Sequence, residues 1–244
     1  MKKSKNRMAN NYFRFKEFTI NQDKAVFKVG TDGVILGACS DLSGASRILD
    51  IGTGTGLIAI MTAQRSNATI IAIEPEVNSY QQACENVMEC KWRNRIEVIN
   101  KGLNEYYSSV DLKFDIILSN PPYFRDSLKN PDKDKSAARH SDSLTELEIL
   151  DGALKLLNQE GSLQLILPYT EGTMFIAEAS RYGFFCNRII KIRPVPTGEI
   201  KRLILKFERT KKQIQEKFLT IETGVRHKYT EDYKEITRDF YLSF

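Results

Sequence analysis

The stretch ILDIGTGTGLIAI, residues 48–60, decides the fold. Its first four residues form a short, mostly apolar run of strand length, and its last four begin an apolar helix pattern. Between them, Gly52, Gly54 and Gly56 alternate with threonines, so the backbone can adopt positive φ angles and come close to a ligand. A turn from a strand into a helix also presents free N–H groups at the helix N-terminus. The stretch predicts a βα unit of an open α/β sheet with a binding site at its turn.

Strands and helices are expected to alternate along most of the chain. Residues 184–194 and 200–209 are two further strand patterns joined by a Pro/Gly turn without a helix, which predicts an antiparallel pair. The fold class is therefore α/β and Rossmann-like, a mostly parallel seven-stranded sheet with an antiparallel C-terminal strand pair and helices on both faces. The other expected strands are residues 47–51, 69–74, 95–100, 113–119 and 162–168, and the expected helices are 32–39, 56–65, 76–90, 144–157 and 170–182.

The first part of the chain precedes this alternation. Residues 12–29 alternate apolar and polar side chains around Asn21–Asp23, which predicts a short hairpin with its turn there. We expect residues 1–44 to form a hairpin and helix extension that packs on the core, and residues 45–244 to form one main domain.

Charge and cysteine content narrow the class of protein. The net charge is +5, yet residues 1–16 hold six basic residues and no acid, and residues 185–214 hold nine basic residues against two acids. Such patches fit a polyanionic partner, although a solubilising surface explains them equally well. Four cysteines without a CxxC pair and only two histidines predict no metal site. With no apolar signal region or membrane-spanning stretch, we expect a cytoplasmic monomer.

An acid after the next strand identifies the ligand of the glycine loop as a nucleoside. Glu74 ends the strand that follows the loop, where a carboxylate can accept hydrogen bonds from both ribose hydroxyls of an adenosine. The glycine spacing is G-x-G-x-G after Asp50, not the dinucleotide spacing G-x-G-x-x-G. This favours S-adenosylmethionine (SAM), which has no phosphate, and leaves a nucleotide-dependent dehydrogenase as a weaker alternative.

A second site follows the strand at residues 113–119, in the sequence NPPY. Two consecutive prolines cannot continue a sheet, so the strand ends in a stiff corner. The side-chain oxygen of Asn120 and the carbonyl of Pro121 can each accept one hydrogen of a planar amine, while Pro122 stiffens the corner and Tyr123 can stack on a base. This chemistry suits adenine N6 or a carboxamide nitrogen.

Both sites resemble those of the class I SAM-dependent methyltransferases of amino groups. The resemblance implies that the motif Asp50, Gly52, Thr53, Gly54 and Gly56 lies under SAM, that Glu74 holds its ribose, and that Asn120 lies beside the methyl donor. The loop after the third strand borders the adenine in that family and often carries an aspartate. Here Gly102 stands at that position, so a backbone contact from Gly102 or Leu103 is the remaining expectation.

A narrower resemblance extends over nearly the whole chain. The stretches FKVGTDGVILGAC (27–39), SAARHSDSLTELEIL (136–150) and YTEDYKEITRDFYL (229–242), with the two motifs, closely resemble the bacterial tRNA1(Val) adenine-37 N6-methyltransferase family. This implies methylation of an adenine in tRNA beside the anticodon, with Thr31 and Asp32 near the methionine end of SAM. Phe124, Arg139 and His140, together with Tyr123, are the expected substrate-binding residues.

Other activities remain open from the residues alone. Glutamine-N5 methyltransferases of release factors share NPPY, although they usually carry an N-terminal helical bundle that we do not recognise before residue 45. Adenine-N6 methylation of another RNA or of DNA fits the same motif. A non-catalytic RNA-binding protein fits less well, because a pure binder needs neither NPPY nor the glycine loop.

Overall fold

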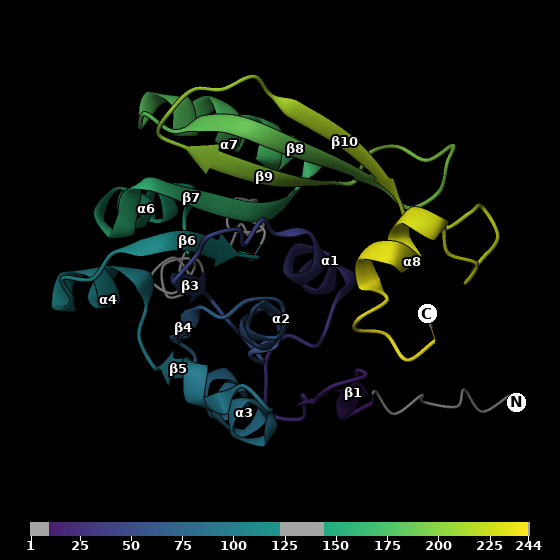
Figure 1. Cartoon of the computed structure of the whole chain (residues 1–244), viewed down its shortest axis with the longest axis horizontal. Helices are drawn as coiled ribbons and strands as arrows, with labels where there is room; N and C mark the ends of the chain where they lie inside the picture. The colour runs from purple at the N-terminus through teal and green to yellow at the C-terminus, as the bar shows by residue number, and fades with distance from the viewer. Residues whose placement is uncertain (1–9, 123–143, 244) are drawn as a thin grey trace, which may run out of the picture.

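The structure, a computed structural model, describes residues 10–122 and 144–243. Its centre is one eight-stranded sheet with helices on both faces (Figure 1). The strands of this sheet are β3 (Arg47–Ile51), β4 (Thr69–Ile73), β5 (Ile96–Ile99), β6 (Phe114–Ser119), β7 (Leu157–Pro168), β8 (Phe185–Arg193), β9 (Arg202–Glu208) and β10 (Gln215–Thr220).

The strand order across the sheet is β10-β8-β9-β7-β6-β3-β4-β5. Every neighbouring pair is parallel except the two pairs made by β9, which runs antiparallel to β7 and to β8. The predicted α/β class, the mostly parallel sheet and the antiparallel C-terminal pair are confirmed. The predicted count of seven strands is wrong, because β10 adds an eighth beside β8. Four of the six residues of β10 are exposed, so this edge strand lacks the apolar run that marks a buried strand.

Helices cover both faces of the sheet and divide its core into two clusters. One cluster contains side chains of the first three helices, and the other contains side chains of α4, α6 and α7. A 3₁₀ turn, Arg93–Arg95, precedes β5. The helices are α1 (Thr31–Cys39), α2 (Leu57–Arg65), α3 (Val77–Glu89) and α8 (Glu231–Thr237) on one face, and α4 (Leu103–Ser109), α6 (Glu146–Leu156) and α7 (Tyr169–Arg181) on the other.

The N-terminal hairpin, formed by β1 (Tyr12–Arg14) and β2 (Thr19–Asn21), differs from the predicted one in its turn. The chain turns at residues 15–18, where the N–H of Phe15 donates to the carbonyl of Phe18 at 2.8 Å. Both rings are buried and stack with centroids 4.6 Å apart. An apolar corner therefore closes the hairpin, whereas Gln22 of the expected turn is buried and accepts a hydrogen bond from Val29 N.

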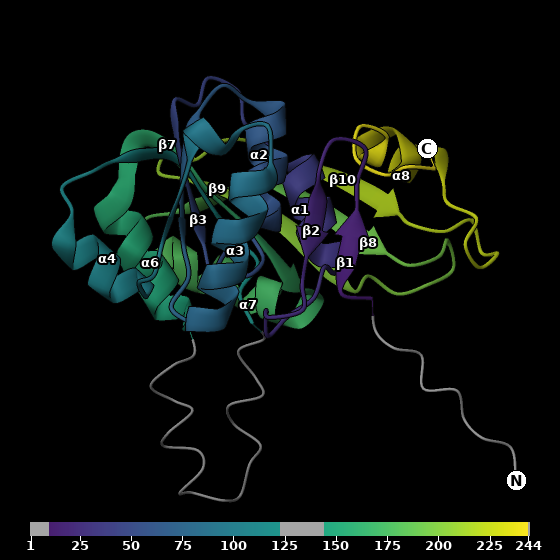
Figure 2. The ribbon, with the colours of Figure 1, turned by 90° about the horizontal axis from the view of Figure 1, so that it is seen from below.

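The two ends of the described chain pack onto the α1 face of the core. The side chain of Asn86 in α3 donates to the carbonyl of Asn21 and accepts from its N–H, which fastens the hairpin beside α3 (Figures 1 and 2). Tyr233 of α8 is buried, and the ring of Tyr241 stacks on that of Phe15 at 5.9 Å. The hairpin and the C-terminal aromatic residues thus belong to the same hydrophobic cluster as α1 and α2.

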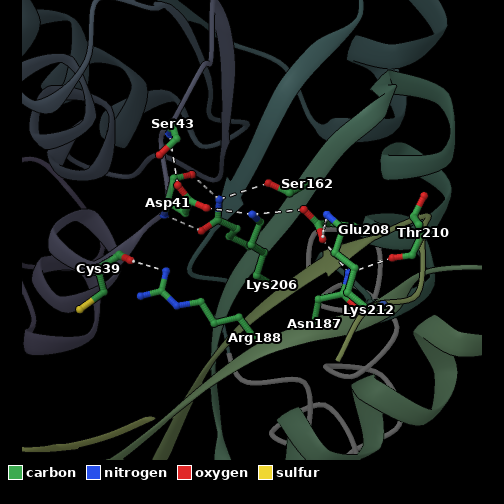
Figure 3. Close-up of polar contacts among 11 residues, drawn as sticks. Cys39, Asp41, Ser43, Ser162, Asn187, Arg188, Lys206, Glu208, Thr210 and Lys212 are labelled. Atoms are coloured by element: carbon green, nitrogen blue, oxygen red, sulfur yellow. Dashed lines mark hydrogen bonds and ion pairs between the residues drawn. The ribbon is translucent and has the colours of Figure 1, made fainter. Parts of the chain in front are cut away.

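A dense polar network lies toward the amino edge of the sheet, where β8 begins, β9 ends and the loop after α1 crosses β7 (Figure 3). Lys206 of β9 donates to Asp41 at 2.9 Å and lies 3.2 Å from a carboxylate oxygen of Glu208. The side chain of Gln164 bonds both the N–H and the carbonyl of Asp41, at 2.9 and 2.8 Å. Asn187 donates to Glu208 at 2.6 Å. We call these five residues the Lys206 network.

No helix in the described ranges 10–122 and 144–243 is both long and apolar enough to cross a membrane.

Candidate active site

The carboxyl ends of four neighbouring strands bring four polar side chains to one edge of the sheet. Asp50 is the penultimate residue of β3, and Glu74, Asn100 and Asn120 follow β4, β5 and β6 within one residue. The chain order reverses between β3 and β6. From β3, the strands β4 and β5 follow on one side of the sheet, whereas β6 and β7 lie on the other side. Open α/β sheets bind ligands outside the carboxyl ends of the strands at this reversal. We call this set of loops the switch-point site.

Positive φ angles and backbone hydrogen bonds fix the shape of the glycine loop after β3. Gly52, Gly54 and Gly56 have φ angles of +68°, +58° and +81°, which only glycine adopts at little cost. The N–H groups of Gly52 and Thr53 donate to the carbonyl of Ile73 and tie the loop to the end of β4. A Cβ built on Gly52 or Gly54 would meet no atom within 4 Å. These two glycines are therefore required by their φ angles, and both border open space.

Glu74 connects this loop to the next strand. One of its carboxylate oxygens accepts from the N–H of Gly54 at 2.9 Å and the other from the N–H of Glu76 at 3.0 Å. Burial raises the pKa of Glu74, against the effect of these two hydrogen bonds. Each oxygen retains a second acceptor position, so the carboxylate can still bind hydroxyl groups of a ligand.

Asp50 lies beneath the glycine loop and is almost fully buried, with 1% of its surface exposed. One carboxylate oxygen accepts from the hydroxyl of Thr53 at 2.6 Å, and the other has no partner of good hydrogen-bond geometry, although the backbone N–H of Ala59 faces the carboxylate and lowers its pKa. Burial raises the pKa of Asp50 to about 7, and the nearby charge of Glu74 acts in the same direction. A buried, unpartnered carboxylate oxygen is costly, so this position is prepared for a donor or a cation.

The corner after β6 is fixed against β3. The hydroxyl of Ser119 donates to the carbonyl of Ile51 at 2.9 Å. Pro121 is buried and Pro122 is exposed, so the corner leaves the sheet directly after Asn120. A Cβ built on Gly33 of α1 would lie 3.9 Å from the amide nitrogen of Asn120. We call residues 120–122 the NPP corner. The first turn of α1 and the NPP corner are thus brought together from positions far apart in the sequence.

Thr31 and Asp32 open α1 beside this corner. Thr31 is exposed, and Asp32 accepts a hydrogen bond from the guanidinium Nε of Arg202 at 2.7 Å. Arg202 begins β9, so this ion pair joins the start of α1 to the carboxyl edge of the sheet. Sequence reasoning did not find Arg202, because 170 residues separate the partners and neither stretch alone indicates the pairing.

The two residues expected near an adenine occupy different environments. Gly102 is the N-cap of α4 with φ −73°, and a Cβ there would meet nothing within 4 Å. Leu103 is buried, and its side chain packs against Gly152 of α6 and not toward the switch-point site. Asn100, which the sequence did not single out, donates to the carbonyls of Glu74 and Pro75 at 2.8 and 3.1 Å.

Four expected substrate residues lie outside the described residues: Tyr123, Phe124, Arg139 and His140. Within the residues that the structure describes, histidine, cysteine, aspartate and glutamate side chains form no group of three or more that could hold a metal ion. The described part of the site therefore consists of the glycine loop, two buried acids, Asn100 and the NPP corner.

Known proteins resemble this chain in sequence and in fold. A protein of Bacteroides thetaiotaomicron named tRNA1(Val) (adenine(37)-N6)-methyltransferase is 46% identical over 96% of this chain and 99% of its own length. A protein of Trichodesmium erythraeum with the same name is 42% identical over 97% of this chain and 100% of its own length. Among solved structures, a predicted O-methyltransferase from Agrobacterium tumefaciens has a TM-score of 0.62 at 18% identity, covering 86% of this chain and 96% of that one. That likeness shows a shared fold.

A family model agrees with these relatives. The model of the methyltransferase small domain matches residues 19–175, which run from β2 into α7 and include every loop of the switch-point site. The relatives extend the similarity through β8, β9, β10 and α8. The chain belongs to the methyltransferase small domain family and, more narrowly, to the family of tRNA1(Val) (adenine(37)-N6)-methyltransferases.

Proposed function

We propose that this protein transfers a methyl group from S-adenosylmethionine to the N6 amine of adenine 37 in tRNA1(Val). The observation that supports this most is the meeting of two elements at one sheet edge: the glycine loop with its acids, and the NPP corner beside α1. The names of relatives 40–46% identical over nearly the full chain supply the substrate.

The described residues fit S-adenosylmethionine. Gly52 and Gly54 border open space, Glu74 keeps acceptor positions for ribose hydroxyls, and Asp50 lies enclosed beneath the loop with one oxygen unpartnered. Within this proposal, Thr31 and Asp32 lie toward the methionine end and the backbone at Gly102 toward the adenine. When bound, the cofactor supplies an electrophilic methyl group on a sulfonium sulfur.

The NPP corner positions the amine in this proposal. The side-chain oxygen of Asn120 and the carbonyl of Pro121 accept the two N6 hydrogens, while Tyr123 stacks on the base and Phe124, Arg139 and His140 contact the RNA. Two fixed acceptors orient the nitrogen lone pair, which is catalysis by positioning. The methylated amine then releases one proton to water, so the corner needs no general base.

The proposal extends to assembly and location. We infer a monomer that acts in the cytoplasm, with residues 1–44 as an extension packed on a methyltransferase domain at 45–244. The side chains of Phe15, Phe18 and Ile20 lie in the same cluster as α1 and α2, which supports treating both parts as one folding unit.

Methyl transfer from labelled SAM to three substrates tests this function. The substrates are an unmodified tRNA1(Val) transcript, the same transcript with adenine 37 changed to guanine, and a release factor. We expect label on the first transcript only. Label on both transcripts would keep RNA methylation and discard position 37. Label on the release factor alone would assign the NPP corner to a glutamine amide and contradict the proposal.

A further inference from the structure

A shallow pocket of about 610 Å³ opens at the carboxyl edge of the sheet, to one side of the NPP corner. Tyr169 follows β7 directly, Arg193 ends β8, and Phe218 lies in β10, so all three side chains come from the edge that carries the switch-point site. β7 is the neighbour of β6, which carries Asn120. We call this the aromatic pocket; its lining residues are Tyr169, Arg193, Gly198, Glu199, Ile200 and Phe218.

Two aromatic side chains of this pocket are exposed. Tyr169 is 46% and Phe218 57% exposed. Leu219, the next residue in β10, is buried in the cluster that contains Tyr233 of α8, so the alternation of the strand turns Phe218 to the opposite face. The N–H of Tyr169 donates to the carbonyl of Lys201 at 3.1 Å, which fixes the start of α7 to the start of β9. The pocket therefore presents aromatic surface on a rigid frame.

Two cationic side chains lie near the exposed ring of Phe218. The Lys191 ammonium lies 5.6 Å and the Arg193 guanidinium 5.9 Å from the ring centroid. Lys191 is paired with Glu216 at 2.6 Å, whereas Arg193 forms no ion pair within the described chain and donates its Nε to Thr220 at 2.9 Å. Its remaining guanidinium N–H groups can bind an anion such as a phosphate. The one acid lining the pocket, Glu199, is paired with Lys201.

We propose that the aromatic pocket binds an unpaired nucleobase of the RNA loop that carries the target adenine, stacked on Phe218 and Tyr169, with a backbone phosphate at Arg193. This inference rests on the proposed function. Exposed aromatic rings beside cations are how proteins hold single-stranded nucleic acid, since every base has a face that can stack. Four strand spacings separate β6 from β10, about 19 Å in total, a span that a few nucleotides of a loop cover.

Alanine substitutions of the two rings test the stacking. Phe218→Ala and Tyr169→Ala are each expected to raise KM for the tRNA1(Val) transcript on the order of tenfold, because one stacked base is lost. SAM affinity and kcat at saturating transcript should stay near wild type, and Phe218→Trp should keep the wild-type KM. Tyr107→Ala is the matched control: its ring also lies under a lysine, with Lys155 Nζ 4.1 Å away, but in α4 at the far end of the sheet. An unchanged KM in both ring variants would overturn the proposal.

Abasic substitutions in the transcript identify the base. Single abasic nucleotides are placed in turn around the target adenine, and each transcript is assayed with wild type and Phe218→Ala. At one position, the effect of the abasic nucleotide on KM and the effect of Phe218→Ala are expected not to add. The abasic nucleotide there has already removed the base that the Phe218 ring binds. Losses that add at every position would show that no base contacts Phe218.

The outcome also separates this inference from the proposed function. If wild type methylates the transcript and Phe218→Ala does so with unchanged KM, only the pocket assignment fails. If wild type labels a release factor and no transcript, the function itself fails, and a Phe218→Ala defect on that protein would assign the pocket to a polypeptide.

Discussion

The two edges of the central sheet use buried polar groups in opposite ways. At the amino edge, the Lys206 network satisfies its charges internally: Lys206 meets two carboxylates, and Asn187 donates to Glu208. At the carboxyl edge, one oxygen of Asp50 has no partner and Glu74 keeps acceptor positions. The first arrangement holds the loop after α1 to the sheet. The second leaves binding capacity where a cofactor is expected.

The pKa values of Asp41 and Asp50 are shifted in opposite directions, in line with this difference. Burial alone would raise the pKa of Asp41, but hydrogen bonds from Lys206 and Ser43 outweigh it and lower the value to about 2. Burial raises the pKa of Asp50 to about 7, since hydrogen bonds from the Thr53 hydroxyl and the Ala59 N–H are too weak to offset it. The comparison teaches that a partly buried carboxylate with its cation present is structural, and a fully buried one without a cation marks a site that a ligand completes.

Removing the cation of the Lys206 network should lower the free energy of unfolding and leave the rate of methyl transfer unchanged. Lys206→Met leaves Asp41 and Glu208 without their shared cation, and because these groups are only partly buried we expect the free energy of unfolding to fall by about 1–2 kcal/mol. Urea denaturation measures this, and activity per folded molecule should stay near wild type. Lys201→Met is the control, because its pair with Glu199 is exposed to solvent and should contribute little to stability. Equal small losses in both variants would contradict the comparison.

Substitutions in the glycine loop at the carboxyl edge should instead weaken the binding of SAM. Gly54→Ala forces a side chain onto a residue with φ +58°, at about 1 kcal/mol, and directs a methyl group into the open loop. We expect SAM affinity, measured by calorimetry, to fall on the order of tenfold or more. Gly183→Ala is the matched control, since its φ of +76° imposes the same strain and its surroundings are open, but it lies in the turn after α7. Comparable losses of affinity in both variants would remove the glycine loop from the cofactor site.

The two aspartates should give stability opposite pH slopes. Asp41 has a folded pKa below its ordinary 3.8, so its stabilisation is present above pH 3.8 and is lost as pH falls toward 2. Asp50 has a folded pKa above 3.8, so it lowers stability progressively as pH rises from about 4 through 7. Melting temperatures without SAM should therefore rise by a few degrees in Asp50→Asn at pH 7–8, and fall in Asp41→Asn. A fall in both variants at pH 7–8 would refute the contrast.

The smallest effect is expected at Gly102. Gly102→Asp provides α4 with a side-chain N-cap and an acid at its N-terminus, worth a few tenths of a kcal/mol. It also places a carboxylate beside the proposed position of the adenine, where it can accept a hydrogen bond from the N6 amine, so we expect SAM to bind about two- to fivefold more tightly. Gly102→Asn separates the cap from the charge. Unchanged SAM binding by Gly102→Asp would show that this loop does not border the cofactor.

Local patterns in the sequence were sufficient to predict the central elements. The strand at 47–51 has the predicted bounds, and the helix after the glycine loop is shorter than predicted by one residue, because apolar runs and glycines mark these boundaries directly. The order of glycine loop, Glu74 and Asn120 along successive strands also predicted one shared edge. Each of these features is encoded within a few residues.

Features that depend on distant partners were not predictable. β10 is a strand only because it pairs with β8, and its exposed, charged residues carry no strand pattern. The pairing of Asp32 with Arg202 and the aromatic pocket at Tyr169 and Phe218 arise from strand order, which places β9, β8 and β10 beyond β7. A single sequence contains these residues but not their proximity.

The rate of methyl transfer by Asn120→Ala tests the central claim most directly. Asn120 supplies one of the two acceptors for the amine in the proposed mechanism and has no assigned part in folding the glycine loop. The rate on the tRNA1(Val) transcript, at saturating SAM and RNA, should fall on the order of 10²- to 10³-fold, with SAM affinity in the same preparation unchanged. A rate close to wild type would mean that the NPP corner does not position the amine, and that the two edges of the sheet do not divide structure from chemistry as described.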